Sequence, residues 1–314
     1  MGRAHKSKAG SMQYWPRKRA KRPYPLIRAW ANLDSVNLLG FLGYKSGMTH
    51  VQVLENNIYL KQSKLKSYAC TIIECPPLKI LGIRFYKNTI YGSKAAGQII
   101  SENLDKELSR KIKLPKKINA KQPEDFDDVK LIVYTQPKLT GIKKKPEIIE
   151  LGISGNKEEK LNYSKNLLGK DIKVSEIFKQ NQNVDVHAIT KGKGFQGPVK
   201  RFGIDLKSHK SEKKRRAPGN LGAWTPKKIL PTVPQAGQMG FQARTEFNKI
   251  ILKISNKIEE INPKSGLEHY GFVKNDYLLI KGSIPGAKKR LIVMTHPIRE
   301  IRTPLPIELK FVKK

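Results

Sequence analysis

Cysteine is scarce in this chain of 314 residues, and long apolar runs are absent. The two cysteines, Cys70 and Cys75, cannot supply a four-ligand zinc site, and the six histidines are scattered along the sequence. We interpret both thiols as reduced side chains of an intracellular protein. No run of about 18 apolar residues occurs, and the N-terminus lacks the apolar core of a signal peptide, so we predict neither a membrane-spanning helix nor a secretory leader.

Acidic residues are also few. The chain has 26 Asp and Glu against 62 Lys and Arg, which gives a formal net charge of +36 at pH 7. Such a charge destabilises a compact isolated chain through self-repulsion and predicts a partner of opposite charge. Nucleic acid is the first candidate. An anionic membrane is the second, but the sequence lacks the amphipathic helix with one apolar face that membrane binding prefers.

A long basic stretch runs from Val184 to Arg244. It opens with the strand-like VDVHAIT. After this strand large apolar residues are sparse, glycine and proline recur, and only Asp205 and Glu212 oppose the cations. A long segment without secondary structure inside a compact domain is either functional or disordered. We predict an extended basic loop over residues 200–240, which a polyanion with phosphates along its backbone would order.

Residues 1–37 form a second basic segment, which we interpret as an arm. Its cations occur almost entirely before the first acid of the chain, Asp34, and are interleaved with aromatic residues such as Trp15 and Trp30. Cations neutralise phosphates and flat rings stack on unpaired bases, so this alternation favours RNA binding. A nuclear-localisation-like or merely solvated tail is the alternative.

Short strands are predicted on both sides of the middle of the chain. LLGFLGYKSGMTHVQVLE predicts two strands joined by a hairpin at residues 45–47, and ACTIIEC and LKILGIRFYK predict two more. Further on, RTEFNKIILKI fits a helix or a strand, and its β-branched residues favour a strand. YGFVKNDYLLIKGSIPGAKKRLIVM predicts two strands with a tight basic connection. The tail from Thr303 is expected to pair with an edge strand. Strands this short and closely spaced favour an antiparallel sheet or barrel.

Residues 92–181 have a more balanced charge and hold half of the acids in the chain. SENLDKELSRKI predicts a helix with Ser101 as its N-cap, KLIVYTQ predicts a buried strand, and YSKNLLG and KVSEIFKQ predict short helical pieces. We interpret the block as a mixed α/β insertion. Asp127 and Asp128 could suggest a metal or general-acid site, but a solvated loop is favoured because no histidine or second acidic motif converges on them.

The residues from Gly192 to Gly197 fit the pattern G-x-G-x-x-G. A dinucleotide site would need the third glycine to open a helix and an acid about 20 residues later to hold a ribose. Here Pro198 and VKRFGI follow, which we interpret as strand-like, so the glycines favour close approach of backbone amides to phosphates. An RNA- or nucleotide-using enzyme with this loop as its active site is the alternative, although the sequence contains no Walker motif, nucleophile elbow or HExxH helix.

Trp224 is the one tryptophan of the basic loop. Its indole could anchor the loop on its own domain, stack on a nucleobase or wedge into a folded RNA surface, and its cationic surroundings favour contact with RNA. His209 lies within LKSHKSEKKRR. Neighbouring cations favour its neutral form without orienting it as a base, so we interpret it as a further group that contacts RNA.

Several long motifs follow one another along the chain: GSMQYWPRKRA, FLGYKSGMTH, TKGKGFQGPVKRFG, GNLGAWTP, VPQAGQMGFQARTEFNK and LLIKGSIPGAKKR. In these motifs, and over nearly its whole length, the chain resembles the large-subunit ribosomal protein L3 family, in its archaeal and eukaryotic form and with an archaeal length. The resemblance implies a closed β-barrel of the translation-protein type, formed by residues 38–91 plus 182–314. This barrel would carry the α/β insertion and two extensions that bind rRNA, the arm and the basic loop.

The resemblance also implies a function. It predicts a cytoplasmic, structural component of the large ribosomal subunit with no catalytic activity, no cofactor and no homo-oligomer, in which any Mg²⁺ is held by the rRNA. Its partners would be large-subunit rRNA and neighbouring ribosomal proteins. The Trp224 tip would approach the peptidyl-transferase region beside the arm, and both would influence aminoacyl-tRNA accommodation and early subunit assembly. The residues expected to contact rRNA are Trp15, Arg17, Lys18, Arg19, Lys21, Arg22, Lys191, Lys193, Lys200, Arg201, His209, Lys210, Lys213, Lys214, Arg215, Arg216, Trp224, Lys227, Lys228 and Arg244.

Overall fold

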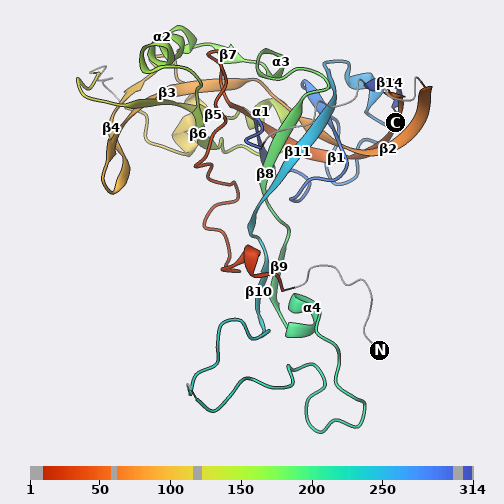
Figure 1. The fold of residues 1–314 in the computed structure, drawn as a ribbon. Helices are drawn as coiled ribbons and strands as arrows, with labels where there is room; N and C mark the ends of the chain where they lie inside the picture. Colours follow the sequence, from red (N-terminus) through yellow and green to blue (C-terminus); the bar gives the residue numbers. More distant parts are fainter. Residues whose placement is uncertain (1–9, 58–61, 116–121, 226, 300–306, 313–314) are drawn as a thin grey trace. The chain divides into compact units, whose positions relative to one another are not determined.

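The computed structural model of the chain, shown in Figure 1, describes residues 10–57, 62–115, 122–225, 227–299 and 307–312. Strands predominate in these residues, which confirms the prediction of a mainly β protein. The chain divides into two compact units. Unit 1 comprises residues 1–23 and 189–243, and unit 2 comprises residues 24–188 and 244–314.

Unit 2 contains a sheet of seven strands. They are β1 (Gly40–Asn57), β2 (Gln62–Glu74), β8 (Asn183–Ile189), β11 (Ala243–Ser255), β12 (Tyr277–Lys281), β13 (Leu291–Thr295) and β14 (Ile307–Val312). The strands pair in the order β13-β8-β11-β12-β2-β1-β14, and β1 also pairs with β13. This additional pairing connects the first strand of the series to the sixth, so each strand from β13 to β1 has a partner on both sides.

β1 is one continuous strand, so the prediction of two strands joined by a hairpin at residues 45–47 is wrong. Residues 40–44 pair with β13, and residues 44–57 pair with β2 across a register shift between Lys45 and Gly47. A hairpin would need the two halves of β1 to pair with each other, whereas each half already has another partner. The turn-like sequence therefore forms a β-bulge, in which Ser46 is buried.

The other strands predicted for this sheet are confirmed. ACTIIEC lies in β2, VDVHAIT forms β8, RTEFNKIILKI forms β11, and the tail pairs with β1 as β14 over its described residues. The segment YGFVKNDYLLIKGSIPGAKKRLIVM supplies β12 and β13, as predicted. These two strands belong to one sheet but are not neighbours in it, because β12 pairs with β11 and β2 whereas β13 pairs with β8 and β1.

A second sheet of unit 2 has five strands. They are β3 (Leu78–Thr89), β4 (Gly92–Ile100), β5 (Asp128–Tyr134), β6 (Ile148–Gly152) and β7 (Asp171–Ile172). The order is β4-β3-β5-β6, with β7 beside β3, and β5 confirms the buried strand predicted for KLIVYTQ. β3 precedes residue 92, where the predicted insertion begins, yet its partners are β4, β5 and β7.

Helices are short in the described part of unit 2. They are α1 (Pro137–Thr140), α2 (Lys157–Leu167), α3 (Val174–Ile177) and the 3₁₀ turns η2 (Lys106–Arg110) and η3 (Ile258–Glu260). α2 and α3 confirm the two helical pieces predicted there. The helix predicted for SENLDKELSRKI is wrong except for η2, whose N-cap position is Asp105. Ser101 instead donates its backbone N–H to the carbonyl of Leu81 at 2.8 Å, which keeps the chain extended beside β3.

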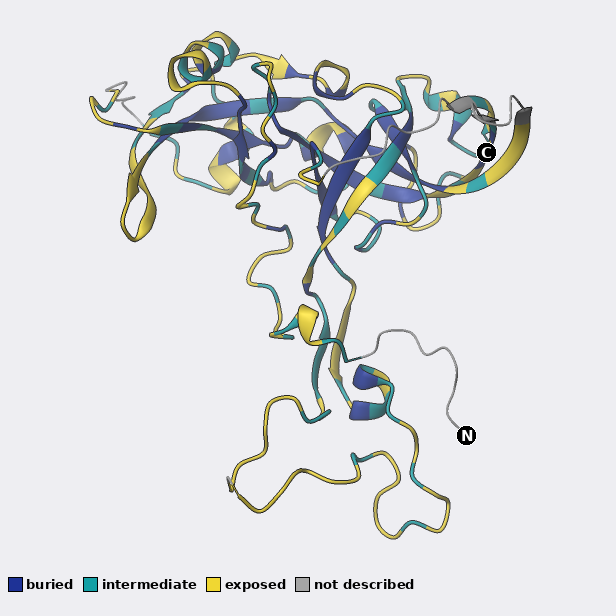
Figure 2. Ribbon diagram, in the orientation of Figure 1, coloured by how far each residue is buried: buried dark blue, intermediate teal, exposed yellow. Residues whose placement is uncertain are grey.

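The two sheets share one apolar core, shown in dark blue in Figure 2. The carboxylate of Glu74 is fully buried within unit 2. It accepts hydrogen bonds from the backbone N–H of Lys274 at 2.8 Å, from the backbone N–H and side-chain amide of Asn275 at 3.0 and 2.8 Å, and from the hydroxyl of Tyr270. These donors compensate the lost hydration of the charge and tie the segment before β12 to the end of β2.

The second half of the predicted arm belongs to unit 2. The indole of Trp30 packs so closely on Gly152 of β6 that a Cβ there would lie 2.7 Å from a ring atom, and a Cβ on Gly40 would lie 3.3 Å from the same ring. Tyr24, Ile27 and Trp30 are half-buried against the core. Glycine is needed at residue 152 because a larger residue would displace the ring that anchors this segment.

Candidate nucleic-acid interface

Unit 1 is organised around a short antiparallel ribbon of β9 (Gly192–Gln196) and β10 (Gly237–Gly240). A Cβ on Gly240, whose φ is +71°, would lie 2.1 Å from the carbonyl oxygen of Lys191, so only glycine fits there. Gly192 and Gly194, the first two glycines of the G-x-G-x-x-G pattern, lie in this antiparallel ribbon. A dinucleotide site requires the parallel strand–helix–strand arrangement instead.

A helix, α4 (Pro198–Phe202), follows the ribbon strand β9, so the strand-like interpretation of VKRFGI is wrong. Proline occupies the first helical position, where its missing N–H costs nothing, and Gly203 ends the helix with a φ of +66°. Both signals were present in the sequence PVKRFG. Residues 204–236 form no helix or strand among their described positions. The two ends of the predicted loop over 200–240 instead belong to α4 and β10.

Phe202 is the buried centre of the contacts between the arm and the base of the loop within unit 1. The Trp15 ring lies 6.4 Å from its ring, measured between centroids. The guanidinium carbons of Arg17 and Arg201 lie 4.6 and 5.0 Å from the Phe202 ring centroid. Phe202 was not predicted as a contact residue, because an isolated phenylalanine in a basic segment carries no pattern.

Two predicted rRNA contacts, Arg17 and Arg201, donate hydrogen bonds inside unit 1. Arg17 donates to the carbonyls of Arg201 and Ser11, both at 3.3 Å. Arg201 donates to the carbonyls of Gln238 at 3.1 Å and Gln235 at 3.0 Å. Burial, together with the neighbouring Arg17 cation, lowers the pKa of Arg201. These two side chains hold the arm, α4 and β10 together.

The arm also lies directly beside the ribbon. The backbone N–H of Ala20 donates to the carbonyl of Phe241 at 2.9 Å. Next to this contact a cavity of about 650 Å³ is lined by both segments. Its lining residues are Arg19, Ala20, Lys21, Gly192, Gly194, Gln238 and Phe241. Two predicted rRNA contacts, Arg19 and Lys21, thus share a cavity with the glycines of the motif.

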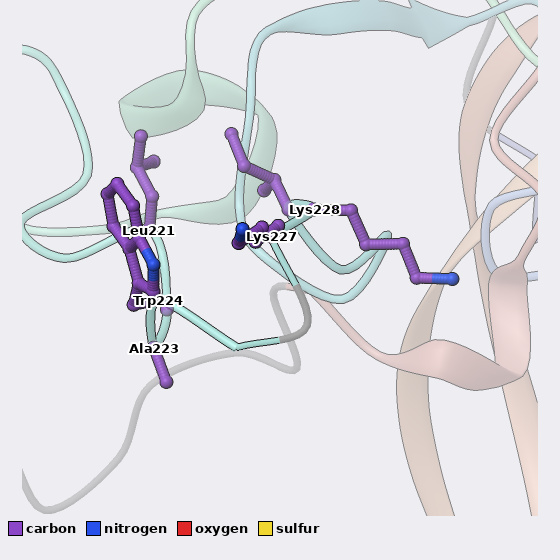
Figure 3. Close-up of a pocket in the computed structure, with 7 residues that line it drawn as sticks. Leu221, Ala223, Trp224, Lys227 and Lys228 are labelled. Atoms are coloured by element: carbon purple, nitrogen blue, oxygen red, sulfur yellow. The ribbon is translucent and has the colours of Figure 1, made fainter.

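The tip of the basic loop presents Trp224 to solvent, with 84% of its surface exposed. The N–H of Lys227, whose φ is +61°, donates to the carbonyl of Trp224 at 2.7 Å. Figure 3 shows Leu221, Trp224 and the two lysines around a pocket of about 510 Å³. The pocket is lined by Leu221, Gly222, Ala223, Trp224, Lys227, Lys228 and Ile229.

Most of the predicted rRNA contacts are exposed side chains of unit 1. The exposed ones are Lys18, Arg19, Lys21, Arg22, Lys191, Lys193, Lys200, His209, Lys210, Lys213, Lys214, Arg215, Arg216, Trp224, Lys227 and Lys228. Trp15, Arg17 and Arg201 are half-buried. Arg244 is half-buried too and belongs to unit 2.

The acidic pair Asp127 and Asp128 is engaged within unit 2. Asp127 accepts the backbone N–H of Asn88 at 2.7 Å, and Asp128, the first residue of β5, pairs with Lys160 at 2.8 Å. Within the described residues, no group of three or more His, Cys, Asp or Glu side chains could hold a metal ion. No helix in the described part of the chain is long and apolar enough to cross a membrane.

By its fold and candidate site, the chain is a mainly β protein that carries a strongly basic unit of extended segments. The sequence profile of the family described as "Ribosomal protein L3" matches residues 1–312. The chain therefore belongs to the ribosomal protein L3 family.

Curated relatives agree with this assignment. The chain is 46% identical to "Large ribosomal subunit protein uL3" of Methanobrevibacter smithii, over 95% of this chain and 94% of the relative. It is 47% identical to the protein of the same name from Archaeoglobus fulgidus and 44% identical to that from Methanocaldococcus jannaschii, in each case over 94% of this chain and 92% of the relative.

Proposed function

We propose that this chain is a structural component of the large ribosomal subunit that binds large-subunit rRNA and catalyses no reaction itself. The family and its curated relatives support this role. The observation that carries the proposal is the construction of unit 1. Its arm and loop contact each other around Phe202, while nearly all of their predicted rRNA contacts remain exposed to solvent.

The proposed mechanism is electrostatic and geometric. Exposed Lys and Arg side chains replace the counterions of the rRNA backbone, and the ribbon glycines permit close approach of the chain to phosphates. The loop beyond α4 gains its order on binding and loses conformational entropy at that point. Arg17 and Arg201 reduce this cost by holding the arm to the loop before the RNA arrives.

In this proposal, unit 2 is the part of the protein that keeps a constant position in the subunit. We propose that the circuit of strand pairings from β13 to β1 is a closed barrel of the translation-protein type, and that residues 92–181 are an insertion into it. The barrel would hold a constant position among the neighbouring ribosomal proteins. The Trp224 tip and the arm would reach toward the peptidyl-transferase region and there support tRNA accommodation and early assembly.

The salt dependence of rRNA binding tests the phosphate contacts of the loop. The full-length protein would be compared with a variant in which Lys213, Lys214, Arg215 and Arg216 are replaced by Gln, using a large-subunit rRNA transcript. Each lost phosphate contact lowers the slope of log affinity against log salt by about 0.7 to 0.9, so four lost contacts lower it by about 3.

A matched control replaces four exposed lysines of unit 2 by Gln, Lys94, Lys106, Lys165 and Lys170. We expect the slope of this control to stay close to that of the unchanged protein. A loop variant with an unaltered slope would contradict the phosphate assignment.

A further inference from the structure

A second basic region lies in unit 2, in the connection from β12 to β13, residues 282–290. No acid occurs between Asp276 and Glu300, whereas the connection and the last residue of β12 contribute four cations. These are Lys281, Lys288, Lys289 and Arg290. None of them is among the rRNA contacts predicted from the sequence.

The carbonyl groups of this connection are turned toward the rest of unit 2. The ammonium of Lys45, in the β1 bulge, donates to the carbonyls of Ile284 at 2.6 Å and Gly286 at 3.4 Å. The hydroxyl of Thr71 donates to the Gly282 carbonyl at 2.8 Å, and the ammonium of Lys249 donates to the Ser283 carbonyl at 3.1 Å.

The arrangement requires unusual backbone conformations. Gly282, Gly286 and Lys289 have φ values of +79°, +102° and +68°. A lysine rarely adopts a positive φ, and here its backbone N–H donates to the Lys45 carbonyl at 2.8 Å. Ile284 is buried in the core and fixes the middle of the connection. The connection is thus held at both ends and in the middle by unit 2.

Several backbone N–H groups of the connection lack the hydrogen-bond partners that its carbonyls have. Those of Ser283, Ala287 and Lys288 donate no hydrogen bond within the described residues. Ser283 is exposed, and Ala287 and Lys288 are half-buried. The N–H groups of Gly282, Lys289 and Arg290 do donate within unit 2. The three that do not lie in a segment whose carbonyls are satisfied internally, and such N–H groups carry the partial positive charge of a backbone anion site.

Cationic residues flank these N–H groups in the sequence. The ammonium of Lys281 lies 3.7 Å from the ring centroid of Tyr68, which is a cation–π contact. Lys289 is exposed. Lys288 is already engaged, because its ammonium pairs with the Glu268 carboxylate at 3.2 Å and donates to the Glu268 carbonyl at 2.7 Å.

We infer that residues 281–290 form a third rRNA-binding site, in which backbone N–H groups and the lysines at 281 and 289 bind phosphates of the RNA backbone. The inference rests on the proposed function and extends it to unit 2. RNA is the favoured occupant because cations and unused N–H groups occur together along a stretch without acids, as a chain of phosphates requires. The site anchors the sheet unit on rRNA independently of the arm and loop.

The test is a double variant of the full-length protein, Lys281→Gln with Lys289→Gln. Its matched control is Lys106→Gln with Lys165→Gln, two exposed lysines of η2 and α2. Affinity for a large-subunit rRNA transcript is measured from low to high salt. We expect the slope of log affinity against log salt to fall by about 1.5 in the double variant, as the loss of two phosphate contacts predicts, and to stay unchanged in the control.

The unchanged protein separates this inference from the proposed function. If it does not bind the transcript with a steep salt dependence, the proposed function fails. If it binds steeply and the double variant keeps the full slope, or the control loses as much slope, only the third site is overturned.

A photo-crosslinking residue placed at position 289 in assembled subunits gives a second result. Capture of large-subunit rRNA supports the site, and exclusive capture of a neighbouring protein overturns it.

Discussion

The two units of this protein are held together by different interactions. Unit 2 buries continuous strands around one apolar core, and its buried charge at Glu74 is fully compensated by hydrogen bonds. Unit 1 buries few apolar residues, among them Ile189 and Phe202, and holds its segments together through arginine–carbonyl hydrogen bonds. The comparison shows that a chain of this charge separates the part that folds by hydrophobic burial from the part that presents cations to a polyanion.

The largest expected effect concerns the core of unit 2. Glu74→Ala removes the acceptor of several buried donors, among them the N–H groups of Lys274 and Asn275. We expect the free energy of unfolding, measured by denaturant titration, to fall by about 3 kcal/mol, because unsatisfied buried donors are costly. Glu158→Ala on the exposed face of α2 is the control and should change it by less than about 0.5 kcal/mol. Equal effects in the two variants would show that the Glu74 network does not stabilise unit 2.

A smaller effect is expected from pH, again in unit 2. His187 lies between the hydroxyls of Thr245 at 2.9 Å and Thr295 at 3.1 Å, and burial lowers its pKa although the nearby Asp185 acts in the opposite direction. Burial likewise lowers the pKa of His296. A lowered folded-state pKa means that the unfolded chain binds more protons once the pH falls below about 6.5, so stability is present above that pH and is lost as the pH falls further.

Thermal unfolding between pH 7.5 and 5 checks this prediction. We expect the melting temperature to fall toward acid pH, and to fall less in His187→Gln. A variant with the same pH dependence as the unchanged protein would exclude His187 as a contributor.

For unit 1, Phe202→Ala tests whether the two units are stabilised independently of each other. The substitution removes the ring on which Trp15, Arg17 and Arg201 pack, but it leaves the core of unit 2 intact. We expect trypsin to cleave the arm several-fold faster near Lys18, while the main unfolding transition shifts by less than about 1 kcal/mol. Phe195→Ala, an exposed residue of β9, is the control and should leave cleavage unchanged. A large loss of global stability in Phe202→Ala would show that the units are not energetically separate.

The smallest effect on stability is expected at the loop tip. Trp224→Ala removes an indole that is 84% exposed, so the free energy of unfolding and the affinity for rRNA should change little. The account predicts a change in aminoacyl-tRNA accommodation in reconstituted subunits, measured by elongation rate and sensitivity to peptidyl-transferase inhibitors. Normal elongation and drug sensitivity would contradict the proposed role of the tip.

The same contrast between the units explains what the sequence could predict. Short apolar runs identified most strands of unit 2, and several of them, such as β8 and β13, are buried at every position. The β1 bulge was missed because Lys45-Ser46-Gly47 is turn-like locally, and only the partners β13 and β2 keep it extended. The helix predicted from Ser101 does not form, because the chain there continues to pair with β3.

In unit 1, composition predicted a basic surface but not its internal organisation. Arg17 and Arg201 were grouped with the exposed cations, since a sequence does not distinguish an arginine that binds carbonyls from one that binds phosphates. The start and end of α4 were readable from Pro198 and Gly203 and were overlooked beside the glycine pattern.

Ultraviolet crosslinking in the host cells, with the RNA sequenced and the peptides mapped, tests whether unit 1 is the principal rRNA-binding surface. We expect crosslinks to large-subunit rRNA from residues 10–23 and from the loop around Trp224. Crosslinks to other RNAs, or crosslinked peptides that come from unit 2 alone, would contradict the assignment of unit 1 as the principal rRNA-binding surface.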